Sequence, residues 1–195
     1  MIDEICRKYN ITDYTINDDG TIDVNGNVDL SQMKLTELPL RFNKVTGYFL
    51  CIENRLTSLK GSPKWVGDSF HCGHNNLTSL EFGPVYVGGY FCCSDNDLTD
   101  LIDSPKQVGG YFSCVRNKKL INPKGCTEKI GEEFYFIDTP LSSIFTNVDQ
   151  FFLHAFNFYK IIKSDTVNLK RLKYVMDLYD KPIDLDKIEK YYRLV

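Results

Sequence analysis

The chain has 195 residues, the size of one domain, and its 43% hydrophobic content is enough to bury a core. Its 23 basic and 26 acidic residues give a formal net charge of −3, which argues against proteins that bind a phosphate backbone through a concentrated basic surface. No apolar run approaches the about 18 residues that span a bilayer, so we expect no membrane segment.

The first residues and the cysteine count predict a cytoplasmic protein. The start at Met1 lacks the basic and apolar regions of a signal peptide. The seven cysteines are an odd number in a chain without an export signal, which favours reduced thiols over a disulfide framework.

Residues 1–23 are expected to form an N-terminal cap. Residues 1–10 read as a short amphipathic helix, with Ile2, Ile5, Cys6 and Tyr9 on one face. The turn signal at 18–20 then predicts a hairpin between residues 14–16 and 21–23.

Residues 24–146 carry a repeat with a period of 21 residues. Several residue types recur at this interval, and a fixed period over so many positions is typical of a solenoid. The recurring positions are Val45, Val66, Val87 and Val108; Phe49, Phe70, Phe91 and Phe112; Cys51, Cys72, Cys93 and Cys114; Asn54, Asn75, Asn96 and Asn117; Leu56, Leu77 and Leu98; Leu59, Leu80 and Leu101; and Pro63, Pro84 and Pro105.

The repeat extends in weaker form at both ends, giving about six rungs, where a rung is one repeat unit. Upstream, Met33 takes the position of the asparagine. Downstream, after a one-residue insertion near residues 118–120, Thr139 takes it. Atypical terminal rungs are expected of a stacked array.

Each unit reads V-x-x-x-F-x-C-x-x-N-x-L-T-x-L and is followed by a G/S-P turn. This pattern resembles the leucine-rich repeat, with one departure: Val45 precedes Phe49 by four residues, where the standard pattern has three. The motifs N-x-L-T-S-L and P-x-x-V-G-G-Y-F-C are similar to those of short leucine-rich-repeat proteins of bacteriophages and bacteria. The resemblance implies a leucine-rich-repeat solenoid with a parallel β-ladder that lines a concave face for partners, and it supplies no activity.

The repeat positions have physical roles. Residues two apart on a strand share a face, so Phe49 and Cys51 both point inward. An asparagine at the turn can bond to the backbone of the neighbouring rung. The recurring prolines favour an extended convex side over a helical one.

Residues 147–195 are expected to be helical. Apolar residues follow helical spacing over 148–162 and 169–179, and Asp184 is a good N-cap for a third, shorter helix. The segment would cap the last rung, or alternatively form a second binding surface or a dimer contact.

We expect no catalytic residues, no metal and no cofactor. There is no phosphate-binding glycine loop and no G-x-S-x-G motif. A surface zinc site formed by His71, His74, Cys92 and Asp95 is the alternative, but their spacing is not a recognised zinc pattern. In this frame Cys92 points outward, so it should be the most reactive repeat cysteine.

The outward strand positions are unusually aromatic and aliphatic for a solvated face, and their edge is acidic. They predict a non-enzymatic module that binds a partner protein, with neither nucleic acid nor membrane as a ligand. The phage resemblance suggests a host protein as partner and inhibition of a host defence protein as the effect; a self-associating or virion-associated structural protein that uses the C-terminal helices is the alternative. The candidate partner-binding residues are Tyr48, Leu50, Ile52, His71, His74, Tyr90, Asp95, Tyr111, Val115, Arg116, Tyr135 and Ile137.

Overall fold

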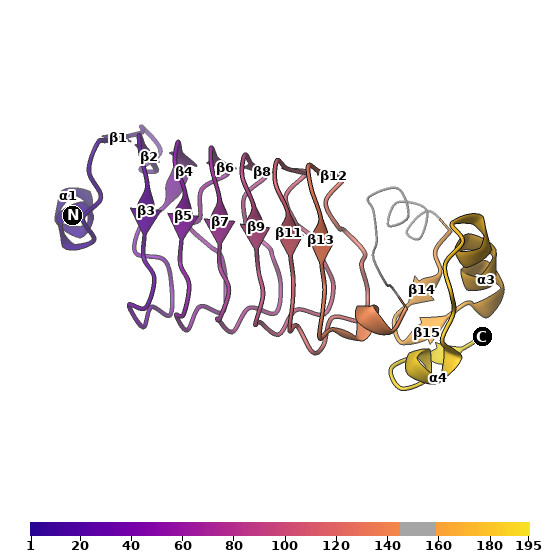
Figure 1. Ribbon diagram of the computed structural model, residues 1–195. Coiled ribbons are helices and arrows are strands. Elements are labelled where there is room, and N and C mark those ends of the chain that lie inside the picture. The colour runs from indigo at the N-terminus through magenta and orange to yellow at the C-terminus, as the bar shows by residue number, and fades with distance from the viewer. Residues whose placement is uncertain (145–158) are drawn as a thin grey trace.

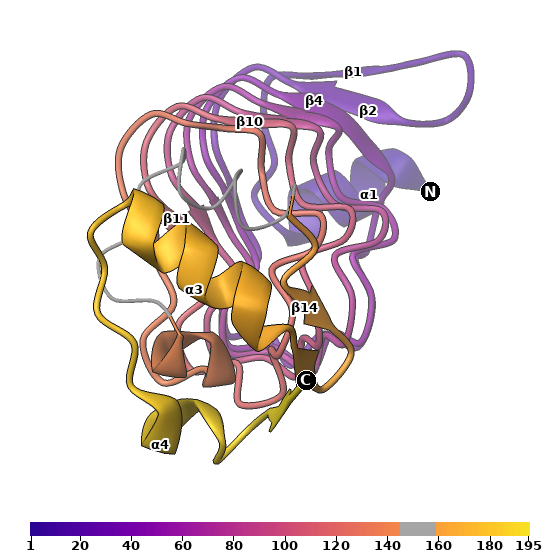
Figure 2. The ribbon, with the colours of Figure 1, turned by 90° about the vertical axis from the view of Figure 1, so that its right-hand side faces the viewer.

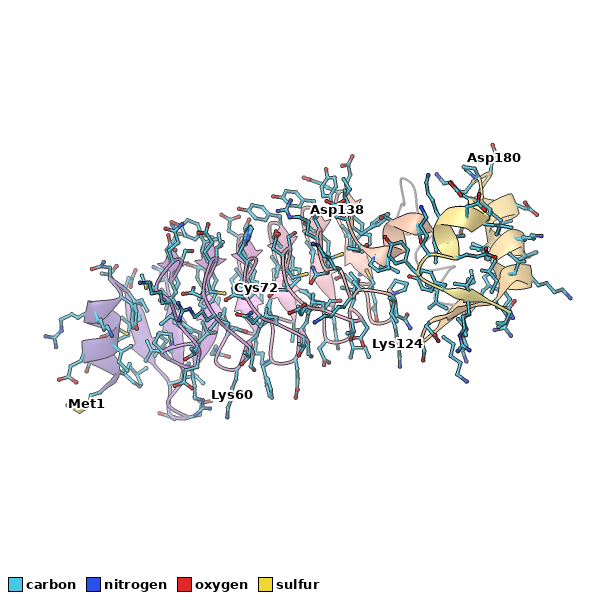
Figure 3. All side chains as sticks on the ribbon, turned by 90° about the horizontal axis from the view of Figure 1, so that it is seen from below. Met1, Lys60, Cys72, Lys124, Asp138 and Asp180 are labelled. Atoms are coloured by element: carbon cyan, nitrogen blue, oxygen red, sulfur yellow. The ribbon has the colours of Figure 1, made fainter. Side chains whose placement is uncertain are left out.

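The computed structural model describes residues 1–144 and 159–195, and its main body is a parallel-strand β-solenoid of about five turns (Figure 1). The rungs follow one another along a nearly straight axis, with the N-terminal helix α1 at one end and a C-terminal module at the other (Figures 1 and 3). The 21-residue period predicted from the sequence is therefore the period of the solenoid.

Each rung contributes two short strands, which belong to two different sheets. The sequence predicted a single ladder; the second sheet explains why the valine precedes the phenylalanine by four residues, because the two residues lie on different strands. The first sheet contains, in order, β1 (Tyr14–Ile16), β2 (Ile22–Val24), β4 (Phe42–Val45), β6 (Trp65–Val66), β8 (Tyr86–Val87), β10 (Gln107–Val108) and β12 (Lys129–Ile130). The second contains β3 (Val28–Asp29), β5 (Phe49–Leu50), β7 (Phe70–His71), β9 (Phe91–Cys92), β11 (Phe112–Ser113) and β13 (Phe134–Tyr135).

Glycine forms the corner between the two strands because successive rungs approach closely there. A Cβ atom on Gly88 would lie 2.1 Å from the carbonyl oxygen of Gly67, and one on Gly109 would lie 2.0 Å from that of Gly88. No side chain fits at such a distance, so these glycines are required by space rather than by backbone angles.

The inward residues of each rung form continuous buried columns. Val66, Phe70, Cys72, Leu77 and Leu80 are at most 1% exposed, and their equivalents in neighbouring rungs stack on them. The phenylalanine rings are almost parallel along the first rungs: the centroids of Phe49 and Phe70 lie 5.5 Å apart with an interplanar angle of 7°. This burial supplies the main favourable free energy of the solenoid.

The repeat cysteines lie in this core as free thiols, as the sequence predicted. Cys51, Cys72, Cys93 and Cys114 are fully buried. Burial raises the pKa of the Cys51 thiol to about 12, because the thiolate would lose its hydration. These side chains therefore act as small hydrophobic groups.

The asparagine of each rung bonds to the backbone of its own rung and of the preceding one. The Asn75 amide donates to the carbonyl oxygens of Cys51 (2.9 Å) and Cys72 (3.1 Å), and its oxygen accepts from the Leu56 amide at 2.9 Å. Asn96 makes the same bonds one rung later, to Cys72, Cys93 and Leu77. The prediction that this side chain links neighbouring rungs is confirmed.

The last rung shows what replaces the asparagine. The register pairs Phe112 with Phe134, so the one-residue insertion is absorbed before β13. The Thr139 hydroxyl donates to the carbonyl oxygen of Phe136 at 2.7 Å, the same bond within the rung that Asn117 makes to Cys114. A hydroxyl is too short to reach the preceding rung as well, which suits a terminal position.

The N-terminal end has the predicted elements. Helix α1 (Ile2–Lys8) places Cys6 in the core, and β1 pairs antiparallel with β2 to form the hairpin. The hairpin adds one antiparallel strand to the edge of the first sheet, and α1 lies across the first rung (Figure 2).

The C-terminal end is mixed in structure rather than only helical. A 3-10 helix η1 (Pro140–Ser143) closes the last rung, and the predicted helix over 148–162 lies mostly outside the described residues. Helix α3 (Leu169–Leu178) coincides with the second stretch of helical spacing, and Asp184 caps α4 (Leu185–Ile188) by accepting from the Lys187 amide. The remaining elements form a three-stranded sheet of β14 (Ile162–Lys163), β15 (Thr166–Val167) and β16 (Arg193–Leu194).

Short strands escaped the sequence analysis here because a two-residue strand has no measurable period. The backbone of Ser164 is left-handed (φ 53°), which reverses the chain between β14 and β15. The Tyr192 hydroxyl donates to the carbonyl oxygen of Ile121 at 2.8 Å, so this module is bonded to the last rungs of the solenoid. None of the helices in the described ranges 1–144 and 159–195 is long and apolar enough to cross a bilayer.

We expect Asn75→Ala to lower the free energy of unfolding by about 1–3 kcal/mol, because the substitution leaves the buried amide of Leu56 without a partner and removes one of the two donors to the Cys51 carbonyl oxygen. Asn76→Ala is the matched control, since Asn76 is the next residue and its side chain is exposed. Urea unfolding followed by circular dichroism measures both. Equal stability of the two variants would contradict the assigned role of the asparagine column.

Candidate functional site

The second sheet presents one outer surface from β5 to β13, which we call the ladder face. In each rung it consists of the residue before the strand, the outward residue of the strand, and the second and third residues after the strand. Strand pairing fixes its columns: Leu50 lies beside His71, His71 beside Cys92, and Cys92 beside Ser113. Figure 1 shows these strands side by side along a nearly straight axis, so the face is a flat strip with little of the expected concavity.

Aromatic rings dominate the second half of the ladder face. The rings of Tyr90 and Tyr111 stack with centroids 4.8 Å apart and an interplanar angle of 5°, as predicted for equivalent positions on adjacent rungs. Tyr135 meets Tyr111 edge to face at 5.6 Å, and its hydroxyl donates to the Glu133 carboxylate. The three rings therefore form one cluster, and Tyr48 lies apart from it because Ser69 occupies the intervening rung.

The exposure of the aliphatic residues rises toward the same end. Leu50, Ile52 and Val115 are half-buried between their neighbours, whereas Ile137 is 61% exposed. Tyr135 is 37% exposed. The aromatic cluster and Ile137 together give the C-terminal half of the ladder face a wide apolar surface.

Cys92 is not the accessible thiol that the sequence predicted. It does lie in an outward column, but only 8% of it is exposed. Its thiol lies 3.3 Å from the Ser94 hydroxyl, which in turn lies 2.9 Å from the Ser113 hydroxyl. The side chains of adjacent rungs cover one another on this face, which explains the low exposure, and the faster labelling of Cys92 than of the fully buried repeat cysteines stays a prediction.

His71 is fixed as a neutral hydrogen-bond donor. Its Nδ1 accepts from the Gly73 amide at 3.1 Å, so in the neutral ring the proton is on Nε2. A Cβ atom on Gly73 would lie 2.7 Å from the His71 ring, which explains the glycine. Burial, followed by the nearby His74, lowers the pKa of His71, so its ring is uncharged at pH 7.

Charged side chains alternate along the outer edge of the ladder face. The Arg116 guanidinium donates twice to Asp95, at 2.6 Å each, and His74 Nε2 lies 3.3 Å from the same carboxylate. The Arg116 bonds lower the pKa of Asp95. Glu53 and Asp138 lie in the same column on either side, so the edge is acidic at its ends and neutralised in the middle.

This edge shares one backbone conformation. The residue before each asparagine is left-handed, with φ of 53° at Glu53, 53° at His74, 55° at Asp95 and 57° at Arg116. The left-handed residue turns the chain so that its own side chain points out while the following asparagine points in. The charged edge and the buried asparagine column are therefore produced by the same turn.

The zinc alternative finds no geometric support. Among residues 1–144 and 159–195, no group of three or more His, Cys, Asp or Glu side chains is placed to hold a metal ion. The four candidate ligands are engaged separately: His71 with Gly73, Cys92 with Ser94, and both His74 and Asp95 in the charged edge.

A second aromatic pair, on the other sheet, was missed by the sequence analysis. The rings of Trp65 and Tyr86 stack at 5.5 Å with an interplanar angle of 8°, and the Lys44 ammonium lies 4.7 Å from the Trp65 ring centroid. These three residues are 21 positions apart in sequence, so the repeat frame itself is the signal that could have found them.

The chain matches no family model, no curated protein and no solved structure.

We expect Asp95→Asn to lower stability slightly at pH 7, and we expect this deficit to shrink as the pH is lowered from 7 to below 3.8. The folded-state pKa of Asp95 is lowered, so its contribution is present above the unfolded-state pKa of 3.8 and is lost as the pH falls through the folded value. Thermal unfolding across this pH range measures the difference. Asp177→Asn, at an exposed site on α3, is the control; a deficit of Asp95→Asn that persists at the acid end would refute the assigned ion pair.

Proposed function

We propose that this protein is a non-enzymatic interaction module that binds a partner protein through the ladder face. The observation that supports the proposal best is the cluster of Tyr90, Tyr111 and Tyr135 beside the exposed Ile137. Clustered aromatic rings with charged groups at the edge are typical of protein interfaces.

The proposed partner has an apolar centre and basic residues at its rim. The stacked tyrosines would bury against the apolar centre of the partner. Glu53 and Asp138 leave the ends of the charged edge acidic, and Glu133 adds a carboxylate beside Tyr135. Charge complementarity would mainly set the association rate and the choice of partner, and burial of the rings would supply affinity. The same acidic edge argues against nucleic acid on this face.

The resemblance to short leucine-rich-repeat proteins of bacteriophages and bacteria adds a biological setting to the proposal. We propose that the 21-residue rungs are a variant of the leucine-rich repeat, that the protein acts in the cytoplasm, and that it inhibits a host protein, such as a defence protein, by covering its surface. The repeat frame V-x-x-x-F-x-C-x-x-N-x-L supports this setting.

The test compares two aromatic pairs. Tyr90→Ala with Tyr111→Ala should reduce capture of the partner from host lysate by at least about tenfold, because the stacked rings of the cluster are removed. Trp65→Ala with Tyr86→Ala removes an equally stacked pair from the other sheet and should leave capture unchanged. Equal melting temperatures of the two double variants ensure that binding, and not folding, is compared.

The opposite result would move the site. Loss of capture with the Trp65 and Tyr86 variant, and not with the tyrosine variant, would place the site on the first sheet. Lys106→Ala is a suitable single control, whereas Lys64 is not, because its ammonium group donates to the carbonyl oxygens of Phe82 and Gly83. The C-terminal region is the alternative binding surface, with Phe151 and Tyr159 as its candidate aromatic residues. Phe151 lies outside the described residues, and the Tyr159 ring packs on the Tyr174 ring with centroids 5.4 Å apart.

A self-associating or virion-associated structural protein is the second candidate, and one observation favours it. Tyr174 and Leu178 are 55% and 59% exposed and lie four residues apart, on one side of α3. An apolar helix side of this kind could pair with its copy in a second molecule. Light scattering over a range of concentrations decides: a dimer that dissociates in Leu178→Glu supports this candidate, and a monomer at every concentration contradicts it.

A further inference from the structure

A cleft of about 840 Å³ lies between the end of the solenoid and the C-terminal module. One wall is the turn at residues 122–125 of the last rungs, and the other is formed by residues 160–164, Thr166, Asn168, Arg171 and Val195. Figure 3 shows Lys124 at this junction, on the edge of the solenoid away from Asp138. The cleft is therefore separate from the ladder face, and its volume is typical of small-molecule sites.

The charge of the cleft differs from that of the whole chain. Lys124, Lys160, Lys163 and Arg171 all line it, and none of the described side chains that line it is acidic. The chain as a whole carries a formal net charge of −3. The neighbouring Asp165 carboxylate is paired with Arg193, so the four cationic groups create a positive potential that attracts anions.

Hydrogen bonds fix Arg171 in the wall that the C-terminal module contributes to the cleft. The Arg171 guanidinium donates to the carbonyl oxygens of Tyr159 (3.3 Å) and Lys160 (3.4 Å), and the Arg171 amide donates to the Asn168 side chain. Lys160 has a left-handed backbone (φ 49°). The bond from the Tyr192 hydroxyl to the Ile121 carbonyl oxygen joins the module to the solenoid.

The cleft also offers apolar and neutral polar groups. Pro123 and Ile162 contribute carbon surface, and Ser164 and Thr166 contribute hydroxyls. A ligand that fits this composition has an anionic part for the lysines and a flat or apolar part for the remaining wall.

We propose that the cleft binds a small phosphorylated ligand of nucleotide size, with its phosphate groups between Lys124 on the solenoid and Lys160 and Lys163 on the C-terminal module. Charge-assisted hydrogen bonds from lysine to phosphate would provide most of the affinity. Because the two sets of lysines come from different walls, the ligand would also tie the module to the solenoid. This site is independent of the proposed partner-binding face.

Isothermal titration calorimetry of the full chain with ATP, inorganic pyrophosphate and adenosine tests the proposal. We expect one ATP per chain, weaker binding of pyrophosphate, and no measurable binding of adenosine. Lys124→Gln with Lys163→Gln should weaken ATP binding by about tenfold or more, since each substitution removes a charge-assisted bond.

Lys60→Gln with Lys118→Gln is the matched control, because it removes the same charge from exposed lysines that do not line the cleft. This control should leave the ATP affinity unchanged. No ATP binding, or equal weakening in both double variants, would overturn the proposal. Tighter binding of a short single-stranded oligonucleotide through the same lysines would also overturn it, since the cleft would then serve nucleic acid.

Discussion

The structure depends on the bonds that one asparagine makes between consecutive rungs. Each such side chain is buried, and it satisfies carbonyl oxygens and an amide that the strand end would otherwise leave without partners, as Asn96 does for Cys72, Cys93 and Leu77. A buried polar group without a partner costs more than a typical hydrogen bond contributes. The central rungs therefore carry an asparagine at this position, whereas the terminal rungs carry Met33 and Thr139.

The same constraint positions the outer surface. The residue before each asparagine must be left-handed to bring the amide inward, and this turn directs the side chains of His74, Asp95 and Arg116 outward in one line. Glycine at the corner lets successive rungs approach, which keeps the strands in register. The tyrosine stack and the charged edge are thus consequences of the rules that build the core, applied to the residues that the core leaves free.

Much of the fold could be predicted because the 21-residue period is visible in the sequence. The buried columns, the asparagine links and the stacking of Tyr90 on Tyr111 all follow from positions 21 residues apart. The second sheet was not predicted, since a strand of two residues such as Trp65–Val66 has no alternation to detect. The burial of Cys92 was also missed, because the frame gives the direction of a side chain but not how closely its neighbours cover it.

The C-terminal region shows the limit of the same reasoning. The helical spacing of residues 169–179 coincides with α3, yet the strands of the small sheet pair residues far apart in sequence, such as Val167 with Leu194. The cleft is likewise formed by segments about 40 residues apart, Lys124 on one wall and Lys163 on the other. No local sequence pattern predicts such pairings, so the small sheet and the cleft could be found only in the three-dimensional structure.

Amide hydrogen exchange measured by NMR tests the central claim most directly, namely that asparagine side chains hold neighbouring rungs together. The amides of Leu56, Leu77 and Leu98 each donate to the asparagine of the following rung and should exchange far more slowly than those of the exposed Thr57, Thr78 and Thr99. In Asn75→Ala, the Leu56 amide should lose its protection first. Leucine amides that exchange as fast as the threonine amides in the unmodified protein would contradict the account.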